Sequence, residues 1–232
     1  MHALASLYKP GTMENKVFYL KNNRLFSGAD DRADDSAHIF TTVLYPPKTA
    51  IFDQGDPTRL VYLVKKGKVR ISRITPDGKE VTVAILGAGD IFGEETLFNA
   101  GERSTVAMTI GEALLCTAKA EDLFELLSRD PELALNVAKI VHERLNSASA
   151  TIEDLAYARV PERLLHLFER LAAEHGIPVD GGTRIDVRLT HADIASLIGS
   201  TRETVTAELA QLTREGRIRS EGGTITLVRR DS

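Results

Sequence analysis

Short runs of apolar and β-branched residues follow one another at close spacing between His38 and about Thr117. They include TTVLY, AIF, LVYLV, KVRIS, EVTVAIL, STVAMTI and ALLCTA, separated by glycine- or proline-containing turns such as GDP and PDGK. Many short strands with such turns are typical of an antiparallel β-roll or jelly roll. We therefore predict a β-roll over residues 38–120. Residues 1–37 form an N-terminal lead-in, in which the polar, acidic residues 21–37 are expected to be mobile or weakly helical.

The apolar period changes after Lys119, where one narrow apolar stripe runs along a long helix. Its members are spaced alternately by four and three residues and are Ala134, Ala138, Val141, Leu145, Ala148, Ile152 and Leu155. So narrow a stripe favours a partner helix, and two copies of the chain would pair along it as a parallel coiled coil. We thus predict connecting and dimerisation helices over residues 121–158. The alternative, that the stripe packs on the chain's own β-roll, stays open because its small alanines suit either partner.

The segment Arg159-Val160-Pro161 interrupts this stripe and marks a domain boundary. Pro161 suits the first turn of a new helix, which Gly176 would end. A short strand (TRIDVRL), two short helices joined by a tight turn at Gly199, and a hairpin closed by Gly222-Gly223 follow. Residues 159–232 are therefore predicted to form a winged helix-turn-helix domain. The fold class is α+β: an antiparallel β-roll, a long dimerisation helix and this C-terminal domain.

The second helix of such a motif enters the major groove of DNA with its first turn. Thr190 is suited to cap the first helix, and Gly199 to supply the left-handed turn residue. The expected inner face is Ile194, Leu197, Ile198, Val205, Leu209 and Leu212, and the expected outer face is Thr201, Arg202, Glu203, Thr206, Ala207 and Ala210.

Two of these outer residues have side chains that read base edges. Arg202 can pair bidentately with guanine, and Glu203 can accept from the amino group of cytosine. Alternatively, Glu203 only closes a capping box that begins at Ser200. We predict that Thr201, Arg202, Glu203 and Thr206 contact DNA, together with a phosphate contact by Thr190.

The charge of the chain bears on how DNA would be bound. The net charge is −4, which argues mildly against a general nucleic-acid binder. Residues 159–232 contain eleven arginines, eleven acidic residues and no lysine, so attraction to phosphate alone is weak for one copy. Binding would therefore depend on base contacts and on dimerisation.

Several other classes of protein are disfavoured. The one cysteine, Cys116, lies in the apolar run ALLCTA, which predicts a buried structural thiol and excludes an internal disulfide and an iron–sulfur cluster. The six histidines are scattered, so we expect no metal site, no haem and no enzyme of the cupin type. No apolar run approaches the roughly 18 residues of a membrane span, and the N-terminus lacks the apolar core of a secretion signal. A cytoplasmic protein without membrane contact is expected.

One polar cluster, IFGEETLFNAGERST (residues 91–105), stands out in the β-roll. A short helical turn at Gly93–Leu97 would offer free N–H groups to a phosphate. Arg103 can clamp the same phosphate bidentately, and Ser104 can add a hydroxyl donor. Glu94 repels phosphate but suits a ribose hydroxyl as an acceptor. The cluster therefore fits a nucleotide better than inorganic phosphate.

These motifs together resemble those of the Crp/Fnr family of bacterial transcription regulators, over about Leu25 to Val228. The resemblance rests on the GDP turn, Gly67, the FGE…L…RS cassette and the SxRET recognition helix. It implies a homodimer that binds palindromic double-stranded DNA, contacts RNA polymerase and responds to a cyclic nucleotide, with cAMP the first choice. It also implies that the effector is held by Gly93, Glu94, Arg103 and Ser104, with Arg144 nearby.

The sequence departs from the cyclic AMP members of that family at two places. Those members have adjacent Thr and Ser residues that reach the adenine, and here the positions are Ala148 and Ser149. Ser149 keeps its hydroxyl, whereas Ala148 has none. A third base-reading position, usually arginine, is Ala207. A regulator that is active without an effector, or that senses a different small molecule, is therefore the alternative.

Overall fold

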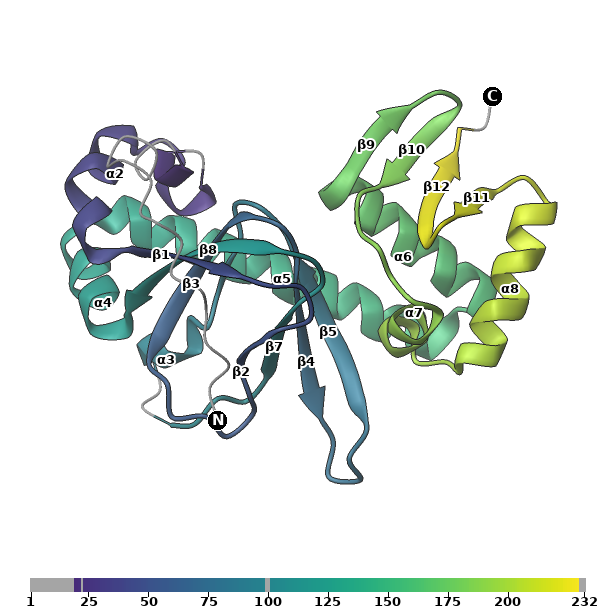
Figure 1. Ribbon diagram of the computed structural model, residues 1–232, viewed down its shortest axis with the longest axis horizontal. Helices are drawn as coiled ribbons and strands as arrows, with labels where there is room; N and C mark the ends of the chain where they lie inside the picture. Colours follow the sequence, from purple (N-terminus) through teal and green to yellow (C-terminus); the bar gives the residue numbers. More distant parts are fainter. Residues whose placement is uncertain (1–18, 22, 99–100, 230–232) are drawn as a thin grey trace. The chain divides into compact units, whose positions relative to one another are not determined.

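The computed structural model describes residues 19–21, 23–98 and 101–229 (Figure 1). The chain folds into two compact units, one of residues 1–79 and 83–145, the other of residues 80–82 and 146–232. They divide inside a long helix, between Leu145 and Asn146, whereas the sequence places a domain limit at Arg159, where the next helix starts. The four predicted domain ranges stay predictions.

Strands of the first unit form two four-stranded sheets, with orders β1-β8-β3-β6 and β2-β7-β4-β5. The pairs β1·β8, β3·β8, β3·β6, β2·β7 and β4·β7 are antiparallel, as predicted for a β-roll. One core cluster contains Phe52, Tyr62 and Phe92, with the last two rings stacked 4.8 Å apart. The strands are β1 (Thr41–Tyr45), β2 (Ala50–Phe52), β3 (Leu60–Lys66), β4 (Val69–Ile74), β5 (Glu80–Leu86), β6 (Ile91–Phe92), β7 (Val106–Thr109) and β8 (Ala113–Lys119).

The segment before the β-roll is helical in its described residues, which agrees with the weakly helical alternative of the prediction and corrects the mobile one. It forms η1 (Arg24–Phe26), α2 (Asp30–Ser36) and η2 (Ala37–Ile39). Leu25 and Phe26 are fully buried, and Phe26 packs edge-to-face on Phe40. Asn136 donates to the carbonyls of Leu25 and Ser27. Tertiary burial thus orders a segment whose local periodicity is weak; residues 1–18 and 22 lie outside the described chain.

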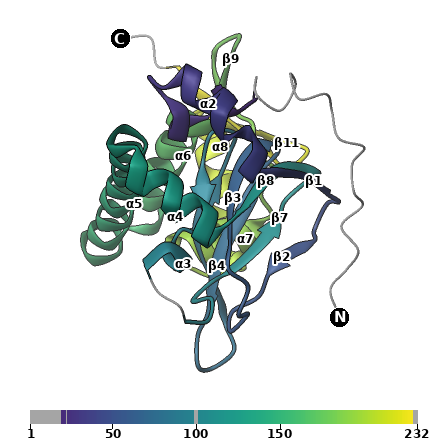
Figure 2. The same ribbon diagram turned by 90° about the vertical axis from the view of Figure 1, so that its left-hand side faces the viewer.

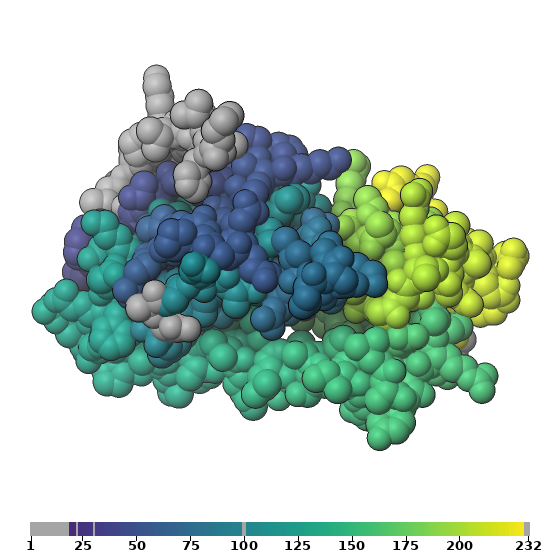
Figure 3. Space-filling view, turned by 90° about the horizontal axis from the view of Figure 1, so that it is seen from below, coloured from purple at the N-terminus to yellow at the C-terminus, as the bar shows by residue number. Residues whose placement is uncertain are grey.

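Two helices follow the β-roll, α4 (Ala120–Arg129) and α5 (Pro131–Tyr157), which lie beside one another in Figure 2. Leu133, Val137 and Ile140 of α5 are buried in the core that this unit forms with its N-terminal helices. These residues lie on a different face from the predicted stripe. In the stripe, Leu145 is 62% and Ile152 68% exposed. The alternative that the stripe packs on the chain's own β-roll is therefore wrong, and Figure 3 shows side chains of α5 at the surface.

In its described residues the second unit contains, after the end of α5, three further helices and a sheet of order β11-β12-β10-β9. Pro161 lies in the first turn of the helix that ends at His175, as predicted. The observed strand covers only the start of the predicted strand TRIDVRL, and an additional strand precedes it. The elements are α6 (Val160–His175), α7 (His191–Ile198), α8 (Arg202–Arg214), β9 (Gly176–Val179), β10 (Gly182–Ile185), β11 (Ile218–Glu221) and β12 (Thr224–Val228).

Within residues 19–21, 23–98 and 101–229, no helix is both long and apolar enough to span a membrane. In the same ranges, no three His, Cys, Asp or Glu side chains gather as a metal site. Cys116 is a buried thiol, as the apolar run around it predicts, and it lies 3.8 Å from the Thr42 hydroxyl.

Candidate functional site

Within the polar cluster, residues 93–94 form a tight turn between β6 and α3 (Glu95–Phe98), which confirms the predicted short helical turn. Gly93 has a φ of +75°, a conformation that glycine adopts without strain. A Cβ on Gly93 would lie 2.9 Å from the Leu60 carbonyl oxygen and 2.9 Å from Arg103 Nη1. The Thr96 hydroxyl donates to the Gly93 carbonyl at 2.9 Å and closes the turn. Backbone geometry and space therefore both require glycine at this position.

Arg103 lies beneath this turn, and its side chain is fully buried. Its guanidinium donates to the Gly93 carbonyl at 3.0 Å and to the Leu60 carbonyl, and it stacks 4.3 Å above the Phe52 ring. Arg103 Nε is buried with no hydrogen-bond partner in the described chain. Arg103 thus cross-links β3 to the cassette, a structural role that the sequence did not indicate.

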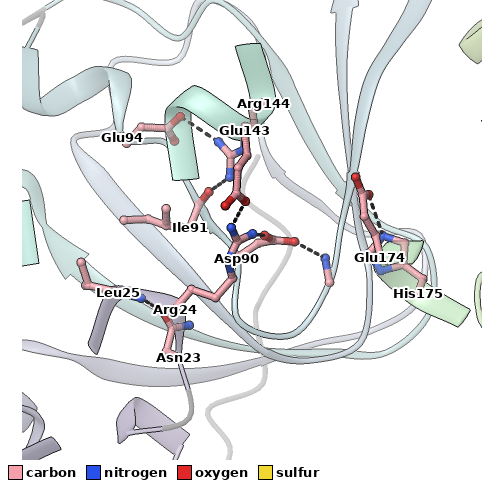
Figure 4. Close-up of polar contacts among 11 residues, drawn as sticks. Asn23, Arg24, Leu25, Asp90, Ile91, Glu94, Glu143, Arg144, Glu174 and His175 are labelled. Atoms are coloured by element: carbon pink, nitrogen blue, oxygen red, sulfur yellow. Dashed lines mark hydrogen bonds and ion pairs between the residues drawn. The ribbon is translucent and has the colours of Figure 1, made fainter. Parts of the chain in front are cut away.

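Glu94 and Arg144 come from segments 50 residues apart and form an ion pair at 2.8 Å (Figure 4). Arg144 also donates to the Ile91 carbonyl, so that it binds both sides of the turn. Both side chains are mostly buried, with 17% of Glu94 and 27% of Arg144 exposed. The pair therefore joins the cassette to α5.

A second link to α5 runs through Arg24 of η1 and the residue directly before the cassette, Asp90. Arg24 donates to the Asp90 carboxylate at 3.1 Å and to the Glu143 carboxylate (Figure 4). Asp90 in turn accepts from the Gly87 amide at 2.8 Å. Sequence reasoning missed this network because Arg24 lies in the segment expected to be mobile or weakly helical, where no tertiary contact was predicted. The one signal in the sequence was that Glu143 directly precedes Arg144, which was already predicted to lie near the effector.

The predicted effector-binding residues fall into two groups. Gly93, Glu94, Arg103 and Arg144 come together within the first unit. Ser104 follows Arg103 and is exposed to solvent. Ser149 is exposed on the part of α5 that belongs to the second unit. Whether these residues bind a ligand stays a prediction.

The helix-turn-helix has the predicted local geometry. Thr190 caps α7 by accepting from the Asp193 amide, and the Asp193 carboxylate accepts in return from the Thr190 amide at 2.8 Å. Gly199 is left-handed with a φ of +60°. Thr201 caps α8 by accepting from the Thr204 amide at 3.2 Å, so the alternative capping box from Ser200 to Glu203 is not formed. Arg163, which the sequence did not single out, donates to the Ile198 carbonyl at 2.7 Å and holds the turn.

One face of α8 is exposed and polar. Val205, Leu209 and Leu212 are buried, as predicted for the inner face. The predicted outer residues are all exposed, and they are Thr201, Arg202, Glu203, Thr206, Ala207 and Ala210. Thr190 at the start of α7 is exposed as well. The wing is β11 and β12, whose turn has positive φ at Gly222 and Gly223, as in a type I′ hairpin.

A β-roll with this cassette, a long helix and a winged helix-turn-helix define a DNA-binding transcription regulator with a cyclic-nucleotide-binding domain. Residues 42–130 match the family model of the cyclic nucleotide-binding domain, and residues 158–232 match that of the Crp-like helix-turn-helix domain. The chain belongs to the Crp/Fnr family of transcription regulators.

Named relatives agree with this membership. The chain is 34% identical over 207 residues to the cyclic AMP receptor protein of Thermus thermophilus, covering 89% of this chain and 93% of the relative. It is 32% identical to the CRP-like cAMP-activated global transcriptional regulator of Mycobacterium tuberculosis, covering 79% and 82%. Its fold is similar to that of the c-di-GMP responsive global regulator CLP of Xanthomonas campestris, with a TM-score of 0.72 at 26% identity, covering 83% and 96%.

Proposed function

We propose that this protein is a homodimeric regulator that binds palindromic DNA and responds to a cyclic nucleotide, cAMP in the first place. The observation that carries the proposal is the Glu94–Arg144 ion pair, since it connects the cassette to α5 at 2.8 Å. A ligand that changes the environment of Glu94 would change the contact that holds α5 at the β-roll.

The chemistry of the cassette suits a cyclic nucleotide. A cyclic phosphate needs N–H and O–H donors, which the α3 turn, Arg103 and the exposed Ser104 hydroxyl supply. Arg103 Nε has no hydrogen-bond partner in the described chain, so the guanidinium is not saturated. A ribose hydroxyl needs an acceptor, and Glu94 is a carboxylate whose present partner is Arg144. The residues therefore fit a nucleotide that presents both groups.

The exposed stripe on α5 supports dimerisation. Val141, Leu145, Ile152 and Leu155 are large apolar side chains that are all at least 40% exposed. Covering them with the same stripe of a second copy would bury this apolar area in a coiled coil. Arg144 directly precedes Leu145, so the residue that contacts the cassette is adjacent to the stripe. Ser149 lies beyond it on α5, where a hydroxyl reaching the adenine is proposed.

The outer face of α8 is proposed to read DNA. Arg202 and Glu203 in its first turn would read adjacent base pairs, with Thr201, Thr206 and the phosphate contact of Thr190 beside them. Two copies of α8, one from each subunit, would lie in successive major grooves about 34 Å apart. RNA polymerase in the cytoplasm is the proposed protein partner, on the strength of family membership.

A second candidate is a regulator of the same kind that needs no effector or takes a different one. Ala148 favours it, because the hydroxyl expected at that position in cyclic AMP members is absent. A missing hydrogen bond to a buried ligand group costs about 1–3 kcal/mol. A solved relative described as c-di-GMP responsive shows that effectors differ among similar folds.

Two experiments test the proposal separately. Calorimetric titration with cAMP, cGMP and c-di-GMP should give saturable heat with cAMP, and silence with all three would contradict nucleotide sensing. Selection of binding sites from a random duplex library, with and without cAMP, should recover a palindrome. Recovery without any enriched sequence would contradict sequence-specific DNA binding.

A further inference from the structure

His191 and Thr206 join the two helices of the helix-turn-helix by a side-chain hydrogen bond. His191 is the first residue of α7, and Thr206 lies one turn into α8 on its exposed face. His191 Nδ1 and Thr206 Oγ1 are 2.7 Å apart. The sequence did not indicate His191 as a functional residue, because it lies on no apolar or ligand pattern.

The hydrogen bonds of Thr206 determine what its hydroxyl can offer to DNA. A hydroxyl has one proton and two lone pairs. Thr206 Oγ1 donates its proton to the Arg202 carbonyl at 2.8 Å, so His191 Nδ1–H donates to Thr206. In the other histidine tautomer, Thr206 would donate to Nδ1 instead. With either tautomer, the single hydroxyl proton of Thr206 is used in a hydrogen bond within the protein. The hydroxyl oxygen can therefore offer only a lone pair to a group on DNA.

We propose that His191 is a specificity-determining positioning residue, which holds the Thr206 hydroxyl as a hydrogen-bond acceptor in the major groove. An acceptor there pairs with the amino group of adenine or cytosine and not with guanine or the O4 of thymine. Without His191, Thr206 can rotate about χ1 and give its proton to an acceptor on a base. The inference rests on the proposed function, in which the outer face of α8 reads base pairs.

The placement of the pair favours this role over simple helix packing. Thr206 is exposed, on the same face as Arg202, whose carbonyl accepts its proton one turn earlier. The buried contacts of α8 are made by Val205, Leu209 and Leu212, on the other side of the helix. The hydrogen bond therefore adds little to the core but restricts one side chain that faces outward.

A matched control exists on the same helix. Thr213 Oγ1 donates to the Leu209 carbonyl at 2.8 Å, which is the same bond from a residue to the carbonyl four before it. No bond from a histidine to Thr213 exists within the described chain. Thr213→Val thus removes an equivalent backbone contact without touching the proposed pair.

The test is a double-mutant cycle on the full-length dimer, read as base preference. Thr206→Val, His191→Leu and the double variant would be measured by competition anisotropy on palindromes carrying all four base pairs at each half-site position. We expect each single variant to lose about two- to tenfold of preference at the same base pair. The double variant should lose no more, because the two residues act as one unit. His191→Gln, which keeps an N–H donor, should retain most of the preference, and Thr213→Val all of it.

Other outcomes overturn the inference. His191→Leu with wild-type preference at the Thr206 step, or losses that multiply in the double variant, would show that His191 does not position Thr206. A loss of affinity equal for all base pairs would assign the pair to folding or phosphate contact. The base pair that Arg202 would read distinguishes failure of the His191 inference from failure of the proposed function. If base preference persists at that pair, only the His191 inference fails. If the wild type has no base preference at any position, the proposed function fails as well.

Discussion

The Arg144 guanidinium of α5 contacts the Glu94 carboxylate of the cassette at 2.8 Å and also donates to the Ile91 carbonyl. One arginine therefore binds the turn that would hold an effector, and it lies one residue before Leu145 of the exposed stripe. Arg24 reinforces the junction by joining Asp90 to Glu143. Two arginines thus tie α5 to this part of the β-roll. Arg144 of α5 pairs with Glu94 of the cassette, and Arg24 joins Asp90, directly before the cassette, to Glu143 of α5.

Arg144→Gln should separate ligand binding from the response to it. A nucleotide that raises DNA affinity must act through a coupling of about 1–3 kcal/mol between the two sites, or roughly five- to 150-fold. Because Arg144→Gln weakens the contact with Glu94, we expect the nucleotide still to bind. The ratio of the DNA affinities with and without nucleotide should, however, fall towards one. Anisotropy titrations of DNA with and without cAMP measure it. Arg129→Gln, which removes an exposed pair with Glu125 on α4, is the control; a wild-type factor in Arg144→Gln would contradict the coupling.

Ser104→Ala should weaken nucleotide binding without affecting the fold. The Ser104 hydroxyl is exposed, so its loss should leave the melting temperature unchanged. We expect about two- to tenfold weaker binding of cAMP by calorimetry, as for one lost hydrogen bond. Arg103→Lys should lose both binding and stability, because Arg103 also supports the carbonyls of Leu60 and Gly93. Unchanged affinity in Ser104→Ala would remove Ser104 from the site.

Gly93→Ala should destabilise the protein more than Gly78→Ala. Both glycines have positive φ, +75° and +81°, and alanine there is strained by roughly 1–2 kcal/mol. Only at Gly93 would the Cβ also meet the Leu60 carbonyl at 2.9 Å, while nothing lies within 4 Å at Gly78. Urea unfolding of the two variants measures the difference. Equal losses would mean that the cassette can relax around a methyl group.

Leu145→Lys and Ile152→Lys should convert dimers to monomers. Each places a charge in the stripe that would be buried between two copies, and a buried unpaired charge is strongly unfavourable. Sedimentation equilibrium should give the chain mass of 25.4 kDa for these variants and twice that mass for wild type. Glu153→Lys, next to Ile152 but on another face of α5, should remain dimeric. A monomeric wild type would contradict the proposed dimer.

Asp154→Asn should destabilise the second unit in a way that depends on pH. Asp154 accepts from Arg170 at 2.8 Å and from His166 at 2.7 Å. Partial burial raises the pKa of Asp154, but the hydrogen bonds from Arg170 and His166 outweigh it and hold that pKa below its ordinary value. A depressed folded pKa stabilises the protein above the unfolded pKa of about 4, and this contribution is lost as pH falls through the folded value.

We therefore expect Asp154→Asn to lose about 1–2 kcal/mol of unfolding free energy at pH 7. The difference from wild type should narrow as pH falls below about 4, because the unfolded wild-type chain then takes up a proton at Asp154 while the folded carboxylate is protonated only at lower pH. Urea unfolding at several pH values measures it, with Glu153→Gln as an exposed neighbouring control. A difference that is constant with pH would assign the effect to packing and not to the ion pairs.

Local patterns in the sequence determined the elements of this protein and the local geometry of its candidate site. Some features depend only on residues that are neighbours in the sequence, so the sequence alone predicts them. They are the strands separated by glycine turns, the Thr190 cap, the left-handed Gly199 and the short turn at Gly93. The same holds for the exposed face of α8, because helical spacing decides which side chains lie together. The residue that caps α8 is Thr201 and not Ser200, so Glu203 is not engaged in a capping box with Ser200.

Only the tertiary structure decided which distant groups meet. Arg103 could be placed near Gly93, but its burial under the Phe52 ring depends on β2 and β3 packing around it. No local hydrophobic periodicity predicts the ordered η1 segment, in which Arg24 contacts both Asp90 and Glu143. Burial of Leu25 and Phe26 stabilises it instead. Pairings such as Glu94–Arg144 and His191–Thr206 arise from chain topology, which local residue preferences do not encode.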